Sequence, residues 1–135
     1  TASLAANPDF GKALAGIWYD TVTLMVSDTA EGAAARAAMG AASGTDQAGF
    51  ESQLAATKLF ATPAEAVAFT TSPDLAATMD KVRGFLFDKG LLGAGAASAD
   101  VIGIELPGGT VLGDAANVKL RFAPDYMQMA ADNAL

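Results

Sequence analysis

Residues 7–26 read NPDFGKALAGIWYDTVTLMV, and this stretch decides how the chain starts to fold. Asn7 is a favourable N-cap residue, and Pro8 fits the first helical position, where a missing N–H loses no hydrogen bond. A mostly apolar stripe follows at steps of three and four residues: Phe10, Leu14, Ile17, Trp18, Thr21 and Met25. This spacing predicts an amphipathic helix over residues 8–26.

Comparable start and stop signals recur along the chain. Thr62, followed by proline and then by Glu65, has the pattern of a capping box. The Ser-Pro pair at 72–73 is a second helix start, and Gly90 stands where a left-handed residue closes a helix. We expect helices over residues 8–26, 29–42, 46–59, 63–70, 73–89 and 124–131.

The pattern changes after Asp100. Residues 101–112, VIGIELPGGTVL, place two short apolar runs around Gly108 and Gly109, which adopt positive φ at little cost and favour a β-hairpin. Residues 118–122, VKLRF, alternate apolar and basic side chains, as in a strand with one buried face. We expect β segments over residues 101–106, 110–113 and 118–122.

These elements define a mainly α fold of the α+β class, with a helical layer and a C-terminal β-hairpin and strand. A hairpin and one strand do not form a stable sheet alone. Either helices cover the sheet, or its partner strands lie outside this sequence. The 135 residues suffice for a single domain over 1–135, unless the chain is a fragment.

The composition excludes several classes of function. Hydrophobic residues make up 52% and charged residues 17%, which excludes a disordered chain. The net charge of −7 argues against nucleic acid and anionic membrane surfaces as partners. The sequence has no cysteine and no histidine, which excludes disulfides, Cys/His zinc sites and Ser-His-Asp triads.

Carboxylates are the abundant groups with catalytic or metal-binding capacity. Asp20, Asp28 and Glu31 fall near one predicted helix junction, where we interpret them as helix caps and solvated side chains. The Gly93–Gly95 segment lacks the strand and the following helix of a phosphate-binding loop. We therefore predict no catalytic residue, no metal site, no cofactor and no enzymatic activity.

Two adjacent aromatic residues are the candidate ligand-binding residues. Neighbours on a helix point in different directions, so Trp18 and Tyr19 cannot both face the core. The favoured interpretation places Trp18 in the core and Tyr19 at the surface. In the alternative, these aromatic side chains line a ligand pocket.

Several phrases in the same order resemble one protein family. These phrases are NPDFGKALAGIWYDTV, TPAEAVAF, SPDLAATMDKVRGFLFDKGLLG and NVKLRFAPDYMQMAADNAL. Together they resemble the C-terminal portion of periplasmic substrate-binding proteins of the nitrate/sulfonate/taurine type. With IGIELPGGTVLGD, they are most like the branch described as urea ABC transporter binding proteins. The resemblance implies part of one lobe of a type II periplasmic binding protein.

The resemblance also implies a function. It implies the solute-binding component of an ABC importer, which captures a ligand by lobe closure in the full-length protein. The implied partners are a small polar or anionic solute and the transporter permease, and the implied location is the periplasm, with the signal peptide absent from this chain. The alternative is a stand-alone helical module for protein–protein interaction or homodimerisation. In either case, exposed apolar helix faces would favour a homo-oligomer.

Overall fold

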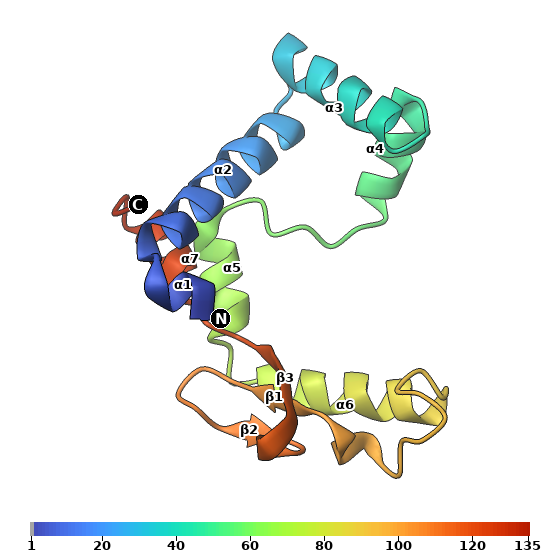
Figure 1. Cartoon of the computed structure of the whole chain (residues 1–135). Helices are drawn as coiled ribbons and strands as arrows, with labels where there is room; N and C mark the ends of the chain where they lie inside the picture. Colours follow the sequence, from blue (N-terminus) through green and yellow to red (C-terminus); the bar gives the residue numbers. More distant parts are fainter. Residues whose placement is uncertain (1) are drawn as a thin grey trace. The chain divides into compact units, whose positions relative to one another are not determined.

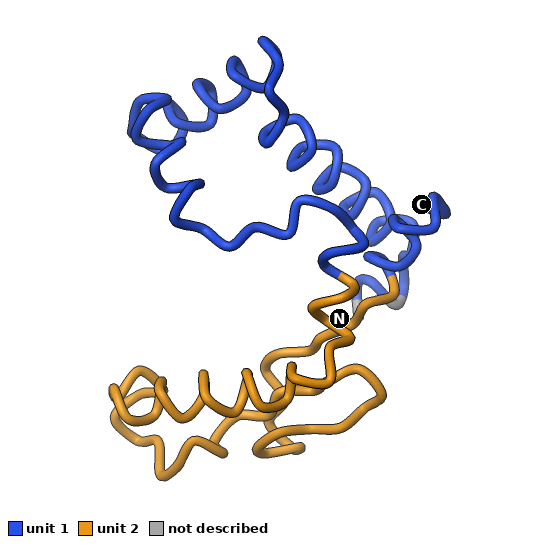
Figure 2. Tube along the Cα trace, turned by 180° about the vertical axis from the view of Figure 1, so that it is seen from behind, with its two compact units in different colours: residues 1–66, 126–135 blue, residues 67–125 orange. Residues whose placement is uncertain are grey.

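The computed structural model describes residues 2–135, and the chain divides into two compact units (Figure 2). Unit 1 runs to Ala66 and resumes at Tyr126–Leu135, whereas unit 2 comprises Val67–Asp125. The chain is mainly helical with a small sheet, which confirms the α+β class (Figure 1). Each unit is described by itself below.

The helices and strands follow the predicted order (Figure 1). The helices are α1 (Ala2–Ala6), α2 (Pro8–Val26), α3 (Ala30–Ala42), α4 (Gln47–Ala55), α5 (Pro63–Thr70), α6 (Leu75–Asp88) and α7 (Asp125–Ala131). The strands are β1 (Gly103–Glu105), β2 (Val111–Leu112) and β3 (Val118–Arg121), with short 3-10 turns η1 (Ala99–Val101) and η2 (Ala115–Asn117). The predicted bounds 8–26 and 63–70 are confirmed, whereas α1, η1 and η2 were not expected.

The predicted helix over 46–59 is too long, because α4 ends at Ala55. The hydroxyl of Thr57 donates to the carbonyl of Gln53 at 2.8 Å. This bond satisfies a carbonyl that the last helical turn leaves open, which stabilises the end of the helix. Residues 56–62 are consequently non-helical, and this loop contributes to the candidate site described below.

The predicted start of the helix over 73–89 is also wrong, because α6 begins at Leu75. The hydroxyl of Ser72 accepts a hydrogen bond from the N–H of Asp74 at 3.2 Å. Serine side chains compete for nearby backbone groups in this way, and the result here is a turn ahead of the helix.

Three other helix signals can be compared with the structure. The capping box is confirmed: Thr62 Oγ1 accepts from the Glu65 N–H at 3.2 Å, and Glu65 Oε2 accepts from the Thr62 N–H at 3.1 Å. Gly90 closes α6 with φ of 68°, as predicted. Asn7 is the N-cap residue of α2, but its side chain makes no capping hydrogen bond.

In unit 1, α2 packs on α3 and α3 packs on α4. Arg36 of α3 connects these three helices. Its Nη1 donates to the carbonyls of Met25 and Ser27, both at 2.9 Å, and its Nε donates to Glu51 Oε1 at 2.8 Å. The guanidinium therefore satisfies carbonyls at the C-terminal end of α2 while its ion pair holds α4.

Unit 2 contains a three-stranded sheet in the order β2-β1-β3. The predicted hairpin is confirmed: β1 and β2 are antiparallel, with Ile104 opposite Leu112. Gly108 and Gly109 in the connecting turn have φ of 87° and 85°. The strand β3 pairs in parallel with β1, which places Leu120 beside Ile104.

The helix α6 supplies the cover that this small sheet requires. The buried core of unit 2 consists of Leu75, Ile104 and Leu106, and Phe69, Ala76, Met79, Leu112 and Phe122 pack against it. The predicted buried face of residues 118–122 is wrong in part, because Leu120 is 44% exposed. The pairing of β1 with β3 shifts register between Gly103 and Ile104, and such an irregularity breaks the alternation of side chains between two faces.

Candidate functional site

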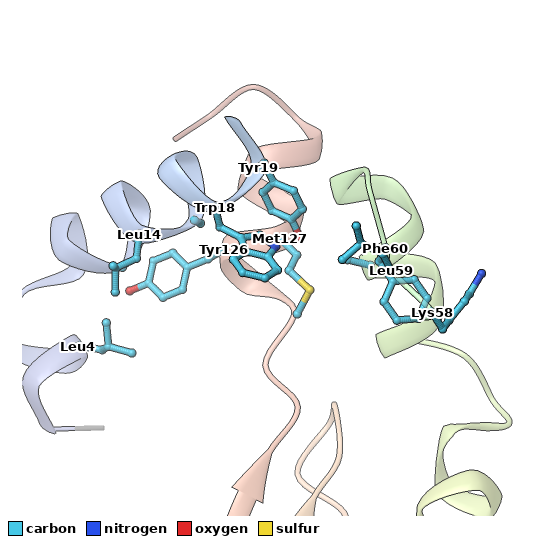
Figure 3. Close-up of a pocket in the computed structure, with 12 residues that line it drawn as sticks. Leu4, Leu14, Trp18, Tyr19, Lys58, Leu59, Phe60, Tyr126 and Met127 are labelled. Carbon is cyan, nitrogen blue, oxygen red and sulfur yellow. The ribbon is translucent and has the colours of Figure 1, made fainter. Parts of the chain in front are cut away.

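A cavity of about 670 Å³ lies within unit 1 (Figure 3). Its walls come from α1, residues 11–19 of α2, the loop after α4, Ala66 of α5 and the start of α7. The lining residues are Leu4, Gly11, Leu14, Ala15, Trp18, Tyr19, Lys58, Leu59, Phe60, Ala66, Tyr126 and Met127. Apart from Lys58, these residues are glycine, alanine, or large apolar and aromatic residues, so the cavity is mainly apolar.

The aromatic side chains face one another across the cavity. Figure 3 shows Trp18, Tyr19 and Met127 on one side, with Leu59 and Phe60 opposite them. The loop residues take this position because α4 ends at Ala55 rather than continuing to residue 59. The cavity thus depends on a helix end that the sequence pattern did not predict.

The candidate ligand-binding residues Trp18 and Tyr19 both line this cavity. Their predicted environments are reversed, because Tyr19 is 9% exposed whereas Trp18 is 55% exposed. The reason is the orientation of α2, which buries Gly11, Tyr19, Val22 and Met25, so that of the predicted apolar stripe only Met25 is buried. Burial also raises the pKa of the Tyr19 phenol, so its hydroxyl stays a neutral hydrogen-bonding group near neutral pH.

A glycine allows α7 to approach α2 at this site. The ring of Tyr126 lies directly over Gly11, so closely that a Cβ atom there would lie 2.6 Å from the Tyr126 hydroxyl oxygen. Real Cβ atoms do not come this close to other heavy atoms, and only glycine leaves the required space. Gly11 and Ala15 therefore form a small-residue part of the cavity wall, and the Tyr126 ring packs against Gly11.

Lys58 is the charged residue among those that line the cavity. Its Nζ lies 5.6 Å from the centroid of the Phe60 ring, within the range of a cation–π contact. Figure 3 shows the ammonium group at the outer edge of the lining residues. None of the ion pairs found in residues 2–135 involves Lys58. The site therefore combines an apolar interior with a positive charge at its margin.

The remaining predicted polar groups lie elsewhere. Asp20 lines a neighbouring cavity of about 300 Å³ in unit 1, with Tyr19 between the two cavities. In the part of the chain that is described, no three acidic residues come close enough together to hold a metal ion. Nor is any helix within residues 2–135 both long and apolar enough to cross a membrane.

Comparison with known proteins gives no match. No protein-family model matches the sequence, no curated protein matches it, and no solved structure matches it. The function is therefore argued from the cavity and its residues.

Proposed function

We propose that unit 1 binds a small ligand whose body is apolar, either aromatic or aliphatic, in the cavity between α2, α7 and the loop after α4. The observation that carries the proposal is the cavity itself, with a volume of about 670 Å³ and four aromatic rings among its lining residues: Trp18, Tyr19, Phe60 and Tyr126. Ligand sites in proteins typically measure about 300–1,000 Å³ and combine apolar walls with a few polar groups.

The chemistry of the walls narrows the ligand class. Aromatic rings bind flat or chain-like apolar groups through stacking and dispersion. Lys58 has a flexible four-carbon stem, and rotation of that stem brings its ammonium group toward the mouth of the cavity. We therefore propose an anionic amphiphile, such as a carboxylate or sulfonate with an apolar body. A small, wholly polar solute fits these walls less well, because its hydrogen-bonding groups would lack partners.

The family resemblance supplies a biological setting for this binding. Under that proposal, the chain is the C-terminal portion of the solute-binding component of an ABC importer, and it corresponds to part of one lobe of a type II periplasmic binding protein. Trp18 and Tyr19 would then form part of the ligand-binding wall. The full-length protein would capture its solute in the periplasm by lobe closure and deliver it to the permease.

A fluorescent probe tests the cavity directly. Anilinonaphthalene sulfonate has an apolar aromatic body and one anionic group, and Trp18, the single tryptophan of the sequence, lies at the cavity wall and transfers energy to a bound probe. We expect the Ala15→Leu variant, which fills the cavity, to weaken probe binding by about tenfold or more. The matched control is Ile17→Ser, at a residue of α2 that is 64% exposed and lies outside the cavity. If Ile17→Ser weakens binding as much as Ala15→Leu does, the probe binds the exposed helix surface and the proposal fails.

The role of Lys58 is tested with a pair of probes. We expect Lys58→Gln to weaken binding of anilinonaphthalene sulfonate several-fold, while binding of the neutral analogue N-phenylnaphthylamine is unchanged. This difference isolates the charge, because both probes share nearly the same apolar body. If the sulfonate binds the wild type and Lys58→Gln with equal affinity, the proposal that the ligand carries an anionic group is wrong.

A further inference from the structure

A second cavity of about 300 Å³ lies in unit 1 beside the one described above. Tyr19 lines both cavities, so its side chain forms part of the wall of each. The other lining residues include Asp20 of α2, Pro63 at the start of α5 and Asn133 just after α7. A water molecule takes about 30 Å³ of liquid, so the cavity has room for a ligand of up to about ten non-hydrogen atoms.

The charge at this second cavity comes from Asp20. Asp20 is the acidic residue among those that line the cavity, and none of the lining residues is basic. Its carboxylate takes part in none of the ion pairs formed within residues 2–135. The net charge of −7 adds a negative potential that attracts cations and repels anions. The polar end of a ligand in this cavity should therefore be cationic.

Asn133 supplies a hydrogen-bonding amide at the same cavity, at a position where glycine would fit the backbone better. The helices α3, α6 and α7 end with the same pair of backbone hydrogen bonds around a residue of positive φ. That residue is Gly44 after α3 and Gly90 after α6, with φ of 76° and 68°, but it is Asn133 after α7, with φ of 54°. Glycine adopts this conformation without steric cost, whereas asparagine only tolerates it. The backbone therefore does not account for a side chain at residue 133, and the cavity gives its amide a use.

We propose that this second cavity binds a primary amine with a small aliphatic body, as the ammonium ion. The N–H groups of the ammonium ion would donate to the Asp20 carboxylate and to the side-chain carbonyl of Asn133, and such charge-assisted hydrogen bonds are strong. The face of the Tyr19 ring also attracts a cation. Pro63 and Leu135 add apolar surface, which suits an organic cation better than a hydrated metal ion. The site is separate from the cavity of the proposed function and does not depend on it.

An NMR titration of the intact chain tests the charge of the ligand. The probes are cyclohexylamine, which is protonated at neutral pH, and cyclohexanol, which has the same size but no charge. The titration follows the side-chain amide signal of Asn133, which is assigned by its absence from the variant Asn133→Gly. We expect cyclohexylamine to shift this signal saturably and to bind at least about tenfold more tightly than cyclohexanol does. Equal affinities for the two probes, or no saturable shift with the amine, would overturn the proposal.

Two matched variants locate the charge that binds the amine. Asp20→Asn removes the carboxylate but keeps the shape of the side chain, and it should weaken amine binding by about tenfold or more. Asp28→Asn removes another exposed carboxylate of unit 1, which does not line the cavity, and it should leave amine binding unchanged. If both variants weaken binding equally, the amine responds to the general negative charge of the chain and the proposed site is wrong.

The variant Asn133→Gly separates binding from folding. It should weaken amine binding several-fold, measured through the side-chain carboxyl signal of Asp20, while it raises Tm because glycine relieves the positive φ. Unchanged amine affinity would show that the amide takes no part and would contradict the proposed site. The two proposals fail separately: Ala15→Leu should weaken binding of anilinonaphthalene sulfonate without affecting amine binding, and Asp20→Asn should do the reverse.

Discussion

Two glycines within α2 allow the effect of the contact between α2 and α7 on the free energy of unfolding to be measured. Both Gly11 and Gly16 lie inside α2, so a change to alanine gives each the same gain in helix propensity. Their surroundings differ. A Cβ at Gly16 would lie 3.8 Å from the Leu135 side chain, an ordinary contact, whereas a Cβ at Gly11 would lie 2.6 Å from the Tyr126 hydroxyl oxygen and 2.7 Å from a carbon of its ring.

The magnitudes follow from these distances. Replacing a mid-helix glycine by alanine stabilises a helix by about 0.5–1 kcal/mol, and we expect this gain for Gly16→Ala. Overpacking a close contact costs about 1–3 kcal/mol, which Gly11→Ala incurs in addition to the same gain. The free energy of unfolding of Gly11→Ala should therefore be lower than that of Gly16→Ala by about 1–3 kcal/mol.

Urea denaturation followed by the fluorescence of Trp18 provides the measurement, because the single tryptophan lies in unit 1 and reports on its unfolding. The Tyr126 ring has a second way to relieve the overlap, which is to rotate into the cavity. In that case Gly11→Ala loses less stability but binds anilinonaphthalene sulfonate more weakly than Gly16→Ala does. If the two variants agree in both stability and probe affinity, Tyr126 does not pack on Gly11 and the described site is wrong.

Two further predictions concern local interactions. Hydrogen bonds from Gln47 and, second, from Arg36 lower the pKa of Glu51, so the ionised carboxylate stabilises the fold above its unfolded pKa. This contribution is lost as the pH falls through the lower folded pKa. Gln47→Ala should raise the Glu51 pKa toward its ordinary value in a carboxyl-carbon NMR titration, and an unchanged pKa would contradict the assigned hydrogen bond. Gly90 has φ of 68°, so Gly90→Ala should lower the free energy of unfolding by about 1 kcal/mol. Gly84 lies within α6 with open space around it, so Gly84→Ala should raise the free energy of unfolding by about 0.5–1 kcal/mol. Thermal melts that rank the two variants in the opposite order would contradict this assignment.

The elements of the fold were largely predictable because their signals are local. Proline at the start of α2 and the capping box at Thr62 and Glu65 act within one helical turn, and the glycine pair of the hairpin acts within four residues. The predicted helix bounds were wrong where a side chain had two local hydrogen-bonding options. The hydroxyl groups of Ser72 and Thr57 bond to backbone groups in ways that move a helix boundary by several residues, and composition alone does not decide between these options.

The packing of unit 1 was not predictable in the same way. The apolar stripe that predicted α2 is a property of that helix, whereas the arc that faces inward depends on which distant segments pack against it. Tyr126 is far from Gly11 in sequence, and nothing near either residue indicates that they meet. Trp18 and Tyr19 were identified as a candidate site because aromatic pairs are conspicuous, but their environments depend on the same long-range contact.

The loop that completes the cavity was missed for a related reason. Leu59 and Phe60 were placed at or beyond the end of a predicted helix, where apolar residues are usually assigned to packing. Once α4 ends at Ala55, these residues face Trp18 across the cavity instead (Figure 3). A helix end four residues earlier thus converts a packing residue into a cavity wall.

The two surfaces of α2 explain why its sequence is so apolar. Its inward arc carries Gly11 and Ala15, whose small size leaves room for Tyr126 and for the cavity. The neighbouring arc carries Phe10 and Ile17, which are more than half exposed in a chain that buries few residues completely. Selection for folding alone would tolerate polar residues on the second arc, because exposed positions contribute little to stability. The exposed apolar side chains of Phe10 and Ile17 are therefore not explained by the packing of unit 1.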